Sequence, residues 1–256
     1  MIDSRAIIDP SAQIAEDVEI GPWTLIGAGV EIGSGCRIAS HVVIKGPTRI
    51  GNNNQIFQFA SVGEACQDKK YRDEPTQLII GDNNVIRESC TLHRGTIQDQ
   101  GITRIGSNNL LMVNVHVAHD CQVGDNIILA NNVALAGHVW VGDYAIVGGQ
   151  TGVHQFCHIG AHSMCGAASM LAQDLPAYVM AAGNTATPHG INAEGLKRRG
   201  FSPEAIRALK QAYKLVYRKR LKLDQALAEL ELLQQQFPEV ALLTQSLRDS
   251  SRGIIR

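Results

Sequence analysis

The chain has 256 residues, 45% of them hydrophobic, so it can bury a large core in one or two domains. Its formal net charge of −1 gives no reason to expect a polyanionic partner such as a nucleic acid. The N-terminus has no signal-peptide pattern and no run approaches about 18 apolar residues, so we expect a cytoplasmic protein without a membrane span.

A six-residue period runs through most of the chain. Aliphatic residues occupy every sixth position from Ile2 to Val62, again from Ile80, and then, displaced by one residue, from Ile105 to Leu171, with Cys165 as the one exception. This period fits neither the 3.6-residue repeat of a helix nor the two-residue repeat of a strand. The second position is often Gly, where we expect a turn with positive φ. The fifth position is mostly small and includes five of the six cysteines, which we interpret as core residues rather than ligands.

This pattern resembles the hexapeptide repeat, and it implies a mainly β fold. We expect residues 1–189 to form a left-handed parallel β-helix with three flat faces and 18 residues per coil, in which stacking supplies the core. Two breaks, at 68–79 and 98–104, are expected to be loops that form binding walls. In the 18-residue frame, one face should carry the hexads that start at Val62, Ile80, Val117, Leu135 and Val153.

Residues 190–256 are expected to form a small C-terminal α-helical domain. Ser202 and Pro203 have the types preferred at a helix start, and apolar residues follow at helical spacing. Two more amphipathic helices are predicted over 223–236 and 238–247. From residue 195 onward there are 13 basic against 6 acidic residues, whereas the remainder has 10 against 18. The basic tail indicates either an acidic partner or simply a solvated helix face.

The stretch "LMVNVHVAHDCQVG" (111–124) places His116 and His119 at outward positions of the repeat. One coil later Gly137 should lie over His119 with His138 beside it, and Gln155 should lie one coil beyond. Such a patch fits general-base chemistry by His119, with Asp120 orienting the ring and the Gly137 N–H stabilising an oxyanion. No serine or cysteine is expected among the outward residues, which favours direct attack by a substrate hydroxyl on an activated acyl group.

Two other classes use this type of solenoid. A zinc hydratase like the γ-type carbonic anhydrases could bind metal through His116, His119 and a third histidine, although the spacing differs from the pattern of that family. A purely structural solenoid would need a repetitive flat face such as a Thr ladder, which is absent. We therefore predict an enzyme with no cofactor and no metal.

Several strings are more specific than the repeat: "QDKKY" (67–71), "LHRGT" (92–96), "HVAHDC" (116–121), "LAGHV" (135–139), "VHQFCHIGAHSM" (153–164), "GLKRRGFS" (195–202) and "RGIIR" (252–256). Together they resemble the UDP-N-acetylglucosamine O-acyltransferase family, which begins lipid A synthesis. The resemblance implies transfer of an R-3-hydroxyacyl group from acyl carrier protein to the glucosamine 3-hydroxyl, in a homotrimer with sites between subunits. It also gives the basic tail an acidic partner, acyl carrier protein.

The resemblance also implies roles for individual residues. His119, Asp120 and Gly137 would be catalytic, and Ala167 would shorten the acyl groove. Substrate contacts are implied for a larger set, consisting of Gln67, Asp68, Lys70, His93, His116, His138, Gln155, Asn192, Glu194, Arg198 and Arg199. The sister N-acyltransferase, which acts on the 3-O-acylated sugar, is the closest alternative. It has a uridine-binding domain before its repeats, for which there is no room before Ile2.

Overall fold

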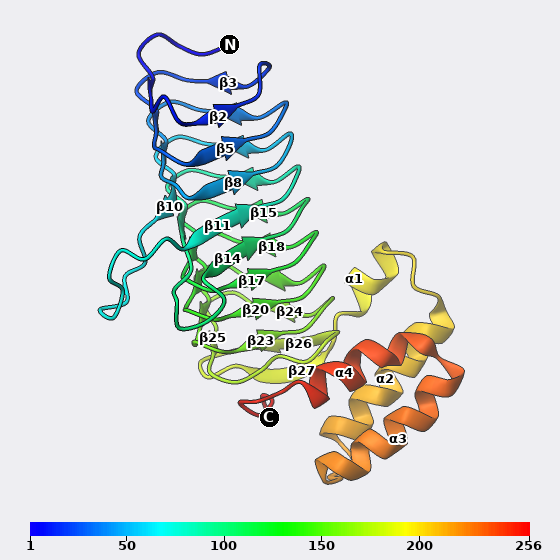
Figure 1. Ribbon diagram of the computed structural model, residues 1–256. Helices are drawn as coiled ribbons and strands as arrows, with labels where there is room; N and C mark the ends of the chain where they lie inside the picture. The colour runs from blue at the N-terminus through cyan, green and yellow to red at the C-terminus, as the bar shows by residue number, and fades with distance from the viewer.

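The computed structural model, which describes residues 1–256, is a column of stacked coils with a group of helices at one end (Figure 1). Each complete coil gives one short strand to each of three sheets, and all strand pairs but the last are parallel. The parallel β-helix expected from the six-residue period is confirmed.

The strands of each face follow one another along the column in chain order. The first face contains β1 (Ile7–Ile8), β4 (Leu25–Ile26), β7 (Val43–Ile44), β10 (Ser61–Glu64), β13 (Thr91–His93), β16 (His116–Val117), β19 (Ala134–Leu135), β22 (Gly152–Val153) and β25 (Met170–Leu171). The second contains β2 (Gln13–Ile14), β5 (Val30–Ile32), β8 (Thr48–Ile50), β11 (Gln77–Ile80), β14 (Ile102–Ile105), β17 (Gln122–Val123), β20 (Trp140–Val141) and β23 (His158–Ile159). The third contains β3 (Glu19–Ile20), β6 (Arg37–Ile38), β9 (Gln55–Ile56), β12 (Val85–Ile86), β15 (Leu110–Leu111), β18 (Ile128–Leu129), β21 (Ile146–Val147), β24 (Met164–Cys165), β26 (Val179–Ala182) and β27 (Thr187–Ile191).

The aliphatic residues at position one of the repeat fill the inside of the column. Ile44, Leu92 and Leu135 are fully buried, and they belong to one continuous core that extends into the helices. All six cysteines are free and buried, as expected for small core residues. Since one coil cannot enclose these side chains alone, each coil depends on its neighbours for burial.

Glycine at position two has a different cause from the one we expected. The residues with positive φ are instead those at position four, such as His41, Asp120 and His138. At position two the next coil approaches too closely for a side chain: a Cβ on Gly21 would lie 2.7 Å from the Ser40 nitrogen. The glycines therefore permit close stacking and do not form the turn.

Three asparagines form a buried ladder at the corner between the second and third faces. The Asn84 side-chain nitrogen donates to the Asn54 side-chain oxygen (3.0 Å) and to the Gly106 carbonyl (2.9 Å). The Asn84 oxygen accepts a hydrogen bond from the Asn109 backbone (2.9 Å). These bonds satisfy the buried amides and tie successive coils together.

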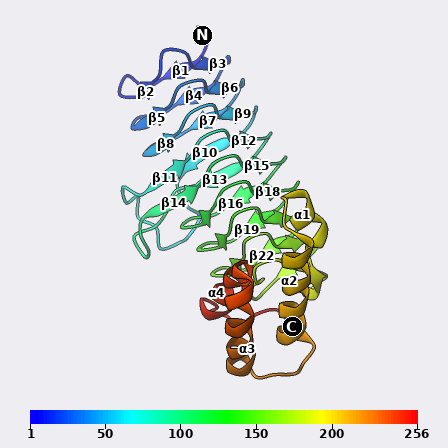
Figure 2. The ribbon, with the colours of Figure 1, turned by 90° about the vertical axis from the view of Figure 1, so that its right-hand side faces the viewer.

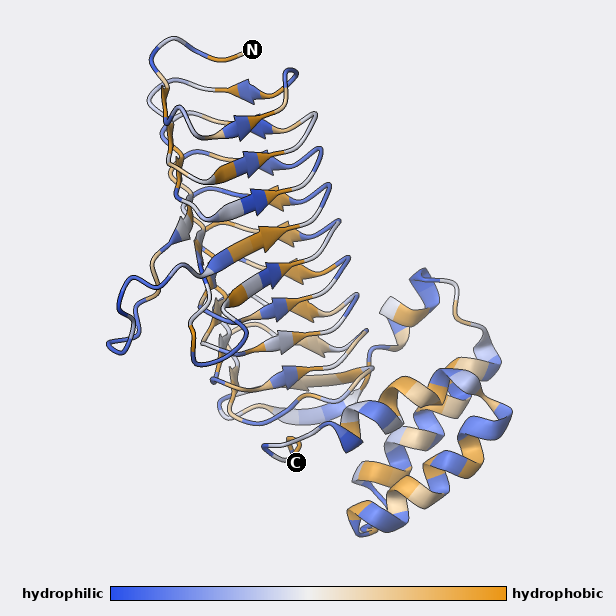
Figure 3. Ribbon diagram, viewed as in Figure 1, coloured by the Kyte–Doolittle hydropathy of each residue, from blue (hydrophilic) through white to orange (hydrophobic).

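Both interruptions leave the column at the corner between the first and second faces. Their bounds differ from the expected ones: β11 already begins at Gln77 and β14 at Ile102, so the loops are residues 65–76 and 94–101. Leu78 and Thr103 are buried, which explains why these segments pair as strands. The first loop is largely hydrophilic and projects from the stack (Figure 3).

The assignment of Ile80 to the first face was wrong. Ile80 lies on the second face, paired with Ile50, and Leu92 takes the expected place on the first face beside Val62. The first loop replaces only the corner between two faces, so the chain returns on the next face instead of completing a coil.

The column ends in features that the repeat does not predict. β26 and β27 form an antiparallel hairpin at the edge of the third sheet, followed directly by the short helix α1 (Ala193–Arg198). The three predicted helices are present as α2 (Pro203–Tyr217), α3 (Leu223–Gln236) and a 3₁₀ turn (Pro238–Val240) that leads into α4 (Ala241–Arg248) (Figure 2). The Ser202 side chain accepts a hydrogen bond from the Ala205 N–H, as expected for the cap of α2. None of the helices combines the length and the apolar character that crossing a bilayer would require.

The C-terminal residues return to the column. Asp174 donates its backbone N–H to the Gly253 carbonyl and accepts from the Ile255 N–H, both at 3.0 Å. The Ser250 hydroxyl also donates to the Asp174 carboxylate (2.6 Å). Ile254 and Ile255 are buried, so this tail covers the last coil.

Candidate active site

His119 lies at the corner between the first and second faces, in the turn that joins β16 to β17. The register of β16, β19 and β22 aligns Gly137 and then Gln155 with His119 in the two following coils, as the sequence predicted. A Cβ on Gly137 would lie 2.6 Å from both Cε1 and Nε2 of the His119 ring. The ring thus occupies space that exists because residue 137 is glycine.

The His119 ring is held by the buried carboxylate of Asp120. Nδ1 of His119 lies 2.8 Å from Oδ2 of Asp120. Burial alone would raise the pKa of Asp120, but hydrogen bonds from His119 and Thr96 outweigh it and lower the pKa below its usual value. Because the ionised carboxylate can only accept, the proton lies on Nδ1 and Nε2 keeps its lone pair.

The second loop positions Asp120 in turn. The Thr96 N–H donates to Oδ1 (2.9 Å) and the Thr96 hydroxyl donates to Oδ2 (2.6 Å). From β14, the Thr103 hydroxyl accepts the Asp120 N–H (2.8 Å). This arrangement, a base oriented by a carboxylate that is itself fixed, is typical of general-base sites.

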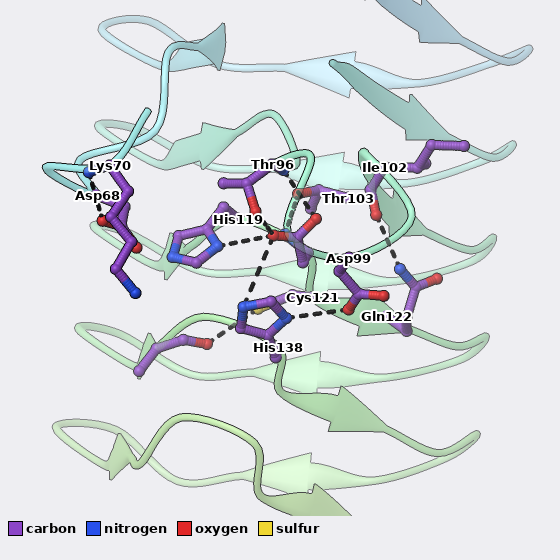
Figure 4. A network of polar contacts seen from close by, with 12 residues as sticks. Asp68, Lys70, Thr96, Asp99, Ile102, Thr103, His119, Cys121, Gln122 and His138 are labelled. Carbon is purple, nitrogen blue, oxygen red and sulfur yellow. Dashed lines mark hydrogen bonds and ion pairs between the residues drawn. The ribbon is translucent and has the colours of Figure 1, made fainter. Parts of the chain in front are cut away.

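His138 lies next to His119 in the following coil (Figure 4). Its ring stacks on Phe156, with centroids 4.4 Å apart, and meets the His119 ring edge to face at 5.0 Å. Nδ1 lies 3.0 Å from Oδ2 of Asp99 in the second loop, and Nε2 lies 3.9 Å from Oδ2 of Asp120. Two imidazoles therefore face one carboxylate oxygen.

His93 and His116 form a second pair beside this group. Nδ1 of His116 lies 2.7 Å from the Thr91 hydroxyl, and the His93 ring meets it edge to face at 5.0 Å. Burial, reinforced by the charges of His116 and His119, lowers the pKa of His93 to about 4. His93 is therefore neutral near pH 7, and any contact with a phosphate would be a hydrogen bond rather than an ion pair.

The first loop places its candidate residues at the same corner. The Asp68 carboxylate accepts the Lys70 N–H (2.8 Å), which shapes a tight turn, whereas the Gln67 and Lys70 side chains are exposed. Figure 4 shows Asp68 and Lys70 with the histidine group. The Arg94 guanidinium donates to the Tyr71 hydroxyl (3.1 Å), so the two loops support each other.

The remaining candidate residues lie elsewhere on the chain. Asn192 is buried: its side chain caps α1 and donates to the His162 carbonyl (3.1 Å). Arg199 donates to the Tyr144 carbonyl (2.8 Å), whereas Glu194 and Arg198 are exposed. Tyr144 and His162 belong to the corner between the second and third faces, and in Figures 1 and 2 α1 and the first loop lie on opposite sides of the column.

Ala167 is exposed at the third corner, between β24 and β25. One chain therefore does not bring together the histidine group, the residues around α1 and Ala167. The resemblance groups these residues as one site, but it does not say that they lie at three different corners of a single chain.

The geometry permits proton transfer and stabilisation of an oxyanion. No acceptor in the chain binds the Gly137 N–H, which is next to the His119 ring. Ligand atoms of His119, Asp120 and His138 lie within 4.8 Å of one another, so these side chains could hold a cation, but His116 is not part of the group. Within one chain, His116 and His119 therefore do not form a three-residue metal site of the kind considered for a zinc hydratase.

Four contributors were missed from the sequence: Thr96, Asp99, Thr103 and Phe156. Thr103 precedes Cys121 by one 18-residue coil, so coil arithmetic would have placed it beside Asp120. Phe156 follows His138 by the same interval. Thr96 and Asp99 lie in the second loop, where no repeat fixes their position.

Comparison with known proteins covers the whole chain. Residues 174–255 match the family described as UDP-N-acetylglucosamine O-acyltransferase, domain 2, and residues 11–46 and 102–137 match the bacterial transferase hexapeptide family. The acyl-[acyl-carrier-protein]–UDP-N-acetylglucosamine O-acyltransferases of Stutzerimonas stutzeri and Saccharophagus degradans are 57% and 59% identical, over 100% of this chain and 99% of each relative. The solved structure of LpxA from Acinetobacter baumannii is 57% identical and superimposes with a TM-score of 0.98, over 100% of this chain and 99% of that one.

Proposed function

Because the chain belongs to the UDP-N-acetylglucosamine O-acyltransferase family, we propose that it transfers an R-3-hydroxyacyl group to the sugar 3-hydroxyl with His119 as general base. The chain is an acyltransferase of lipid A biosynthesis that uses acyl carrier protein and UDP-N-acetylglucosamine. The observation that carries the mechanism is the His119 ring, which is held by Asp120 and packs beside Gly137, whose backbone N–H has no acceptor in the chain.

The reaction proceeds by direct attack. Nε2 of His119 takes the proton of the sugar hydroxyl as its oxygen bonds to the thioester carbonyl carbon. The Gly137 N–H stabilises the oxyanion that forms. When the carbon–sulfur bond breaks, the proton on His119 passes to the departing thiolate, which regenerates the base.

No serine lies beside His119 and Gly137 to form a covalent acyl-enzyme, and the thiols there are buried. The thiol next to the catalytic residues, Cys121, is fully buried, and burial raises its pKa to about 12. Its sulfur donates to the Ala136 carbonyl (3.2 Å) in the core. Direct transfer avoids the need for such a group.

Substrate binding is proposed to need more than one copy of the chain. One copy would contact the sugar, the phosphates and the acyl donor through Gln67, Asp68, Lys70, His93, His116, His138 and Gln155. The neighbouring copy would contact the nucleotide through residues at another corner than that of His119, namely Asn192, Glu194, Arg198 and Arg199. A homotrimer with sites in its clefts satisfies this requirement.

Two further expectations belong to this proposal. Ala167, exposed in the turn before β25, is expected to close the acyl groove and favour shorter chains. The six free, buried thiols fit a reducing compartment, in line with a cytoplasmic location.

The test is a mass-spectrometric assay on chelator-treated protein with UDP-N-acetylglucosamine and R-3-hydroxyacyl carrier proteins of several chain lengths. We expect an acylated nucleotide sugar, its absence with His119→Ala, and normal product with the exposed control His189→Ala. Loss of activity on chelation, restored by Zn²⁺, would contradict the metal-free mechanism. A preference for the longest chains would contradict the role given to Ala167.

A further inference from the structure

The second loop, residues 94–101, contacts one imidazole of the site directly and supports the other through Asp120. Thr96 binds Asp120, which holds His119, and Asp99 binds His138 directly at 3.0 Å. Resting on the function proposed above, we propose that Asp99 is a positioning residue that fixes the tautomer and ring orientation of His138 and so presents Nε2 to the nucleotide sugar.

The hydrogen-bond partners define which nitrogen is free. The Asp99 carboxylate can only accept, so Nδ1 of His138 carries the proton. Nε2 is 3.9 Å from the Asp120 oxygen, too far for a hydrogen bond, and has no other partner in the chain. A neutral His138 therefore offers Nε2 as an acceptor for a substrate hydroxyl or amide N–H, groups that UDP-N-acetylglucosamine carries.

No other contact of His138 selects this orientation. Stacking on Phe156 fixes the plane of the His138 ring, but it would be kept if the ring flipped about its Cβ–Cγ bond and exchanged its nitrogen and carbon atoms. The edge-to-face contact with His119 is likewise not specific for one tautomer. Only the Asp99 carboxylate distinguishes the two orientations, because it requires a donor at Nδ1.

Asp99 can act in this way without supporting the fold. Its side chain is 41% exposed on a loop, whereas the His138 side chain is 14% exposed. An ion pair or hydrogen bond at such an exposed site contributes little to folding. Loss of Asp99 should therefore change the site while the column stays intact.

The experiment compares Asp99→Ala and Asp99→Asn with the matched control Gln98→Ala, an exposed neighbour in the same loop. Ring-¹⁵N histidine NMR reports the His138 tautomer, with the signals assigned through His138→Gln. We expect a protonated Nδ1 in the wild type and in Gln98→Ala, and a shift toward protonated Nε2 in Asp99→Ala. Asp99→Asn should lie between them, because its amide oxygen can still accept.

Kinetics supply the second measurement. Asp99→Ala should raise KM for UDP-N-acetylglucosamine about tenfold and leave KM for the acyl carrier protein unchanged. In a His138→Gln background, adding Asp99→Ala should have no further effect, because its target is gone.

The outcomes separate this inference from the function on which it rests. An unchanged His138 tautomer in Asp99→Ala, or a KM equal to that of Gln98→Ala, would overturn the role of Asp99. An equal effect of Asp99→Ala with and without His138 would also overturn it. An inactive wild type would instead overturn the proposed function, and the NMR comparison, which needs no substrate, would still decide the Asp99–His138 pairing.

Discussion

The imidazole of His119 fills the space in which a side chain at Gly137 would lie. Gly137→Ala should displace the ring from both Asp120 and the oxyanion N–H, and we expect kcat to fall by roughly 10²-fold. Steady-state assays measure the fall in kcat, and thermal unfolding shows whether the substitution also affects stability. Gly27→Ala is the control, because its Cβ would meet nothing closer than 3.3 Å. Equal activity of the two variants would contradict the packing argument.

Asp120→Asn tests the tautomer of His119. The amide can keep its oxygen toward the Thr96 N–H and turn its nitrogen toward Nδ1, which then becomes an acceptor and moves the ring proton to Nε2. The base is blocked, and kcat should fall by roughly 10²- to 10⁴-fold with KM nearly constant.

Thr96→Val is the milder companion variant, because it removes one hydrogen bond to Asp120 and keeps the carboxylate. We expect a loss of about tenfold in kcat. A Thr96→Val enzyme as impaired as Asp120→Asn would mean that the loop, and not the charge, is decisive.

Two buried histidines should make stability depend on pH. Burial lowers the pKa of His93 and of His162 to about 4, and in His162 the nearby Arg199 charge adds to the effect. The folded state thus binds fewer protons than the unfolded state, in which histidine titrates near 6.5. This contribution to stability is complete above about pH 6.5 and is lost as the pH falls toward 4.

When the pH is lowered from 7 to 5, we expect the free energy of unfolding to fall by about 2 kcal/mol for each of the two histidines. Urea unfolding of His93→Gln at pH 7 and at pH 5 should show a difference in unfolding free energy that is smaller by about 2 kcal/mol than in the wild type, whatever the absolute stability of the variant. The exposed His189→Gln is the control. A slope unchanged by His93→Gln would mean that the pKa of His93 is the same in the folded and unfolded chains.

The asparagine ladder should be essential to the stack. Asn84→Ala leaves the Gly106 carbonyl and the Asn109 N–H without partners in a buried corner, and we expect a loss of about 2–4 kcal/mol. Denaturant unfolding compares it with Asn131→Ala, an exposed asparagine of the same column. A loss below about 0.5 kcal/mol would show that water replaces the missing bonds.

The repeat made the fold predictable because every sixth residue must face inward. Val117, Leu135 and Val153 followed one another in register as expected, and so did the positions of His119 and Gly137. The error at Ile80 arose at the first loop, where the chain leaves the repeat and the periodicity no longer fixes which face it rejoins.

The candidate site was predictable only where the repeat positions its residues. Asp99 and Thr96 reach the histidines from a loop whose path depends on contacts such as Arg94 with Tyr71. The separation of Arg199 from His119 depends on which corner α1 covers, and that follows from packing against Tyr144 and His162.

The contact of Ile254 and Ile255 with Asp174 has a consequence for biosynthesis. The coils can stack one after another as the chain leaves the ribosome, since each contacts only its neighbours in the column. The cover of the last coil, however, is made by residues that are translated only after α2, α3 and α4. The end of the column therefore stays uncovered while the three helices are being synthesised, and it closes only when residues 253–255 reach Asp174.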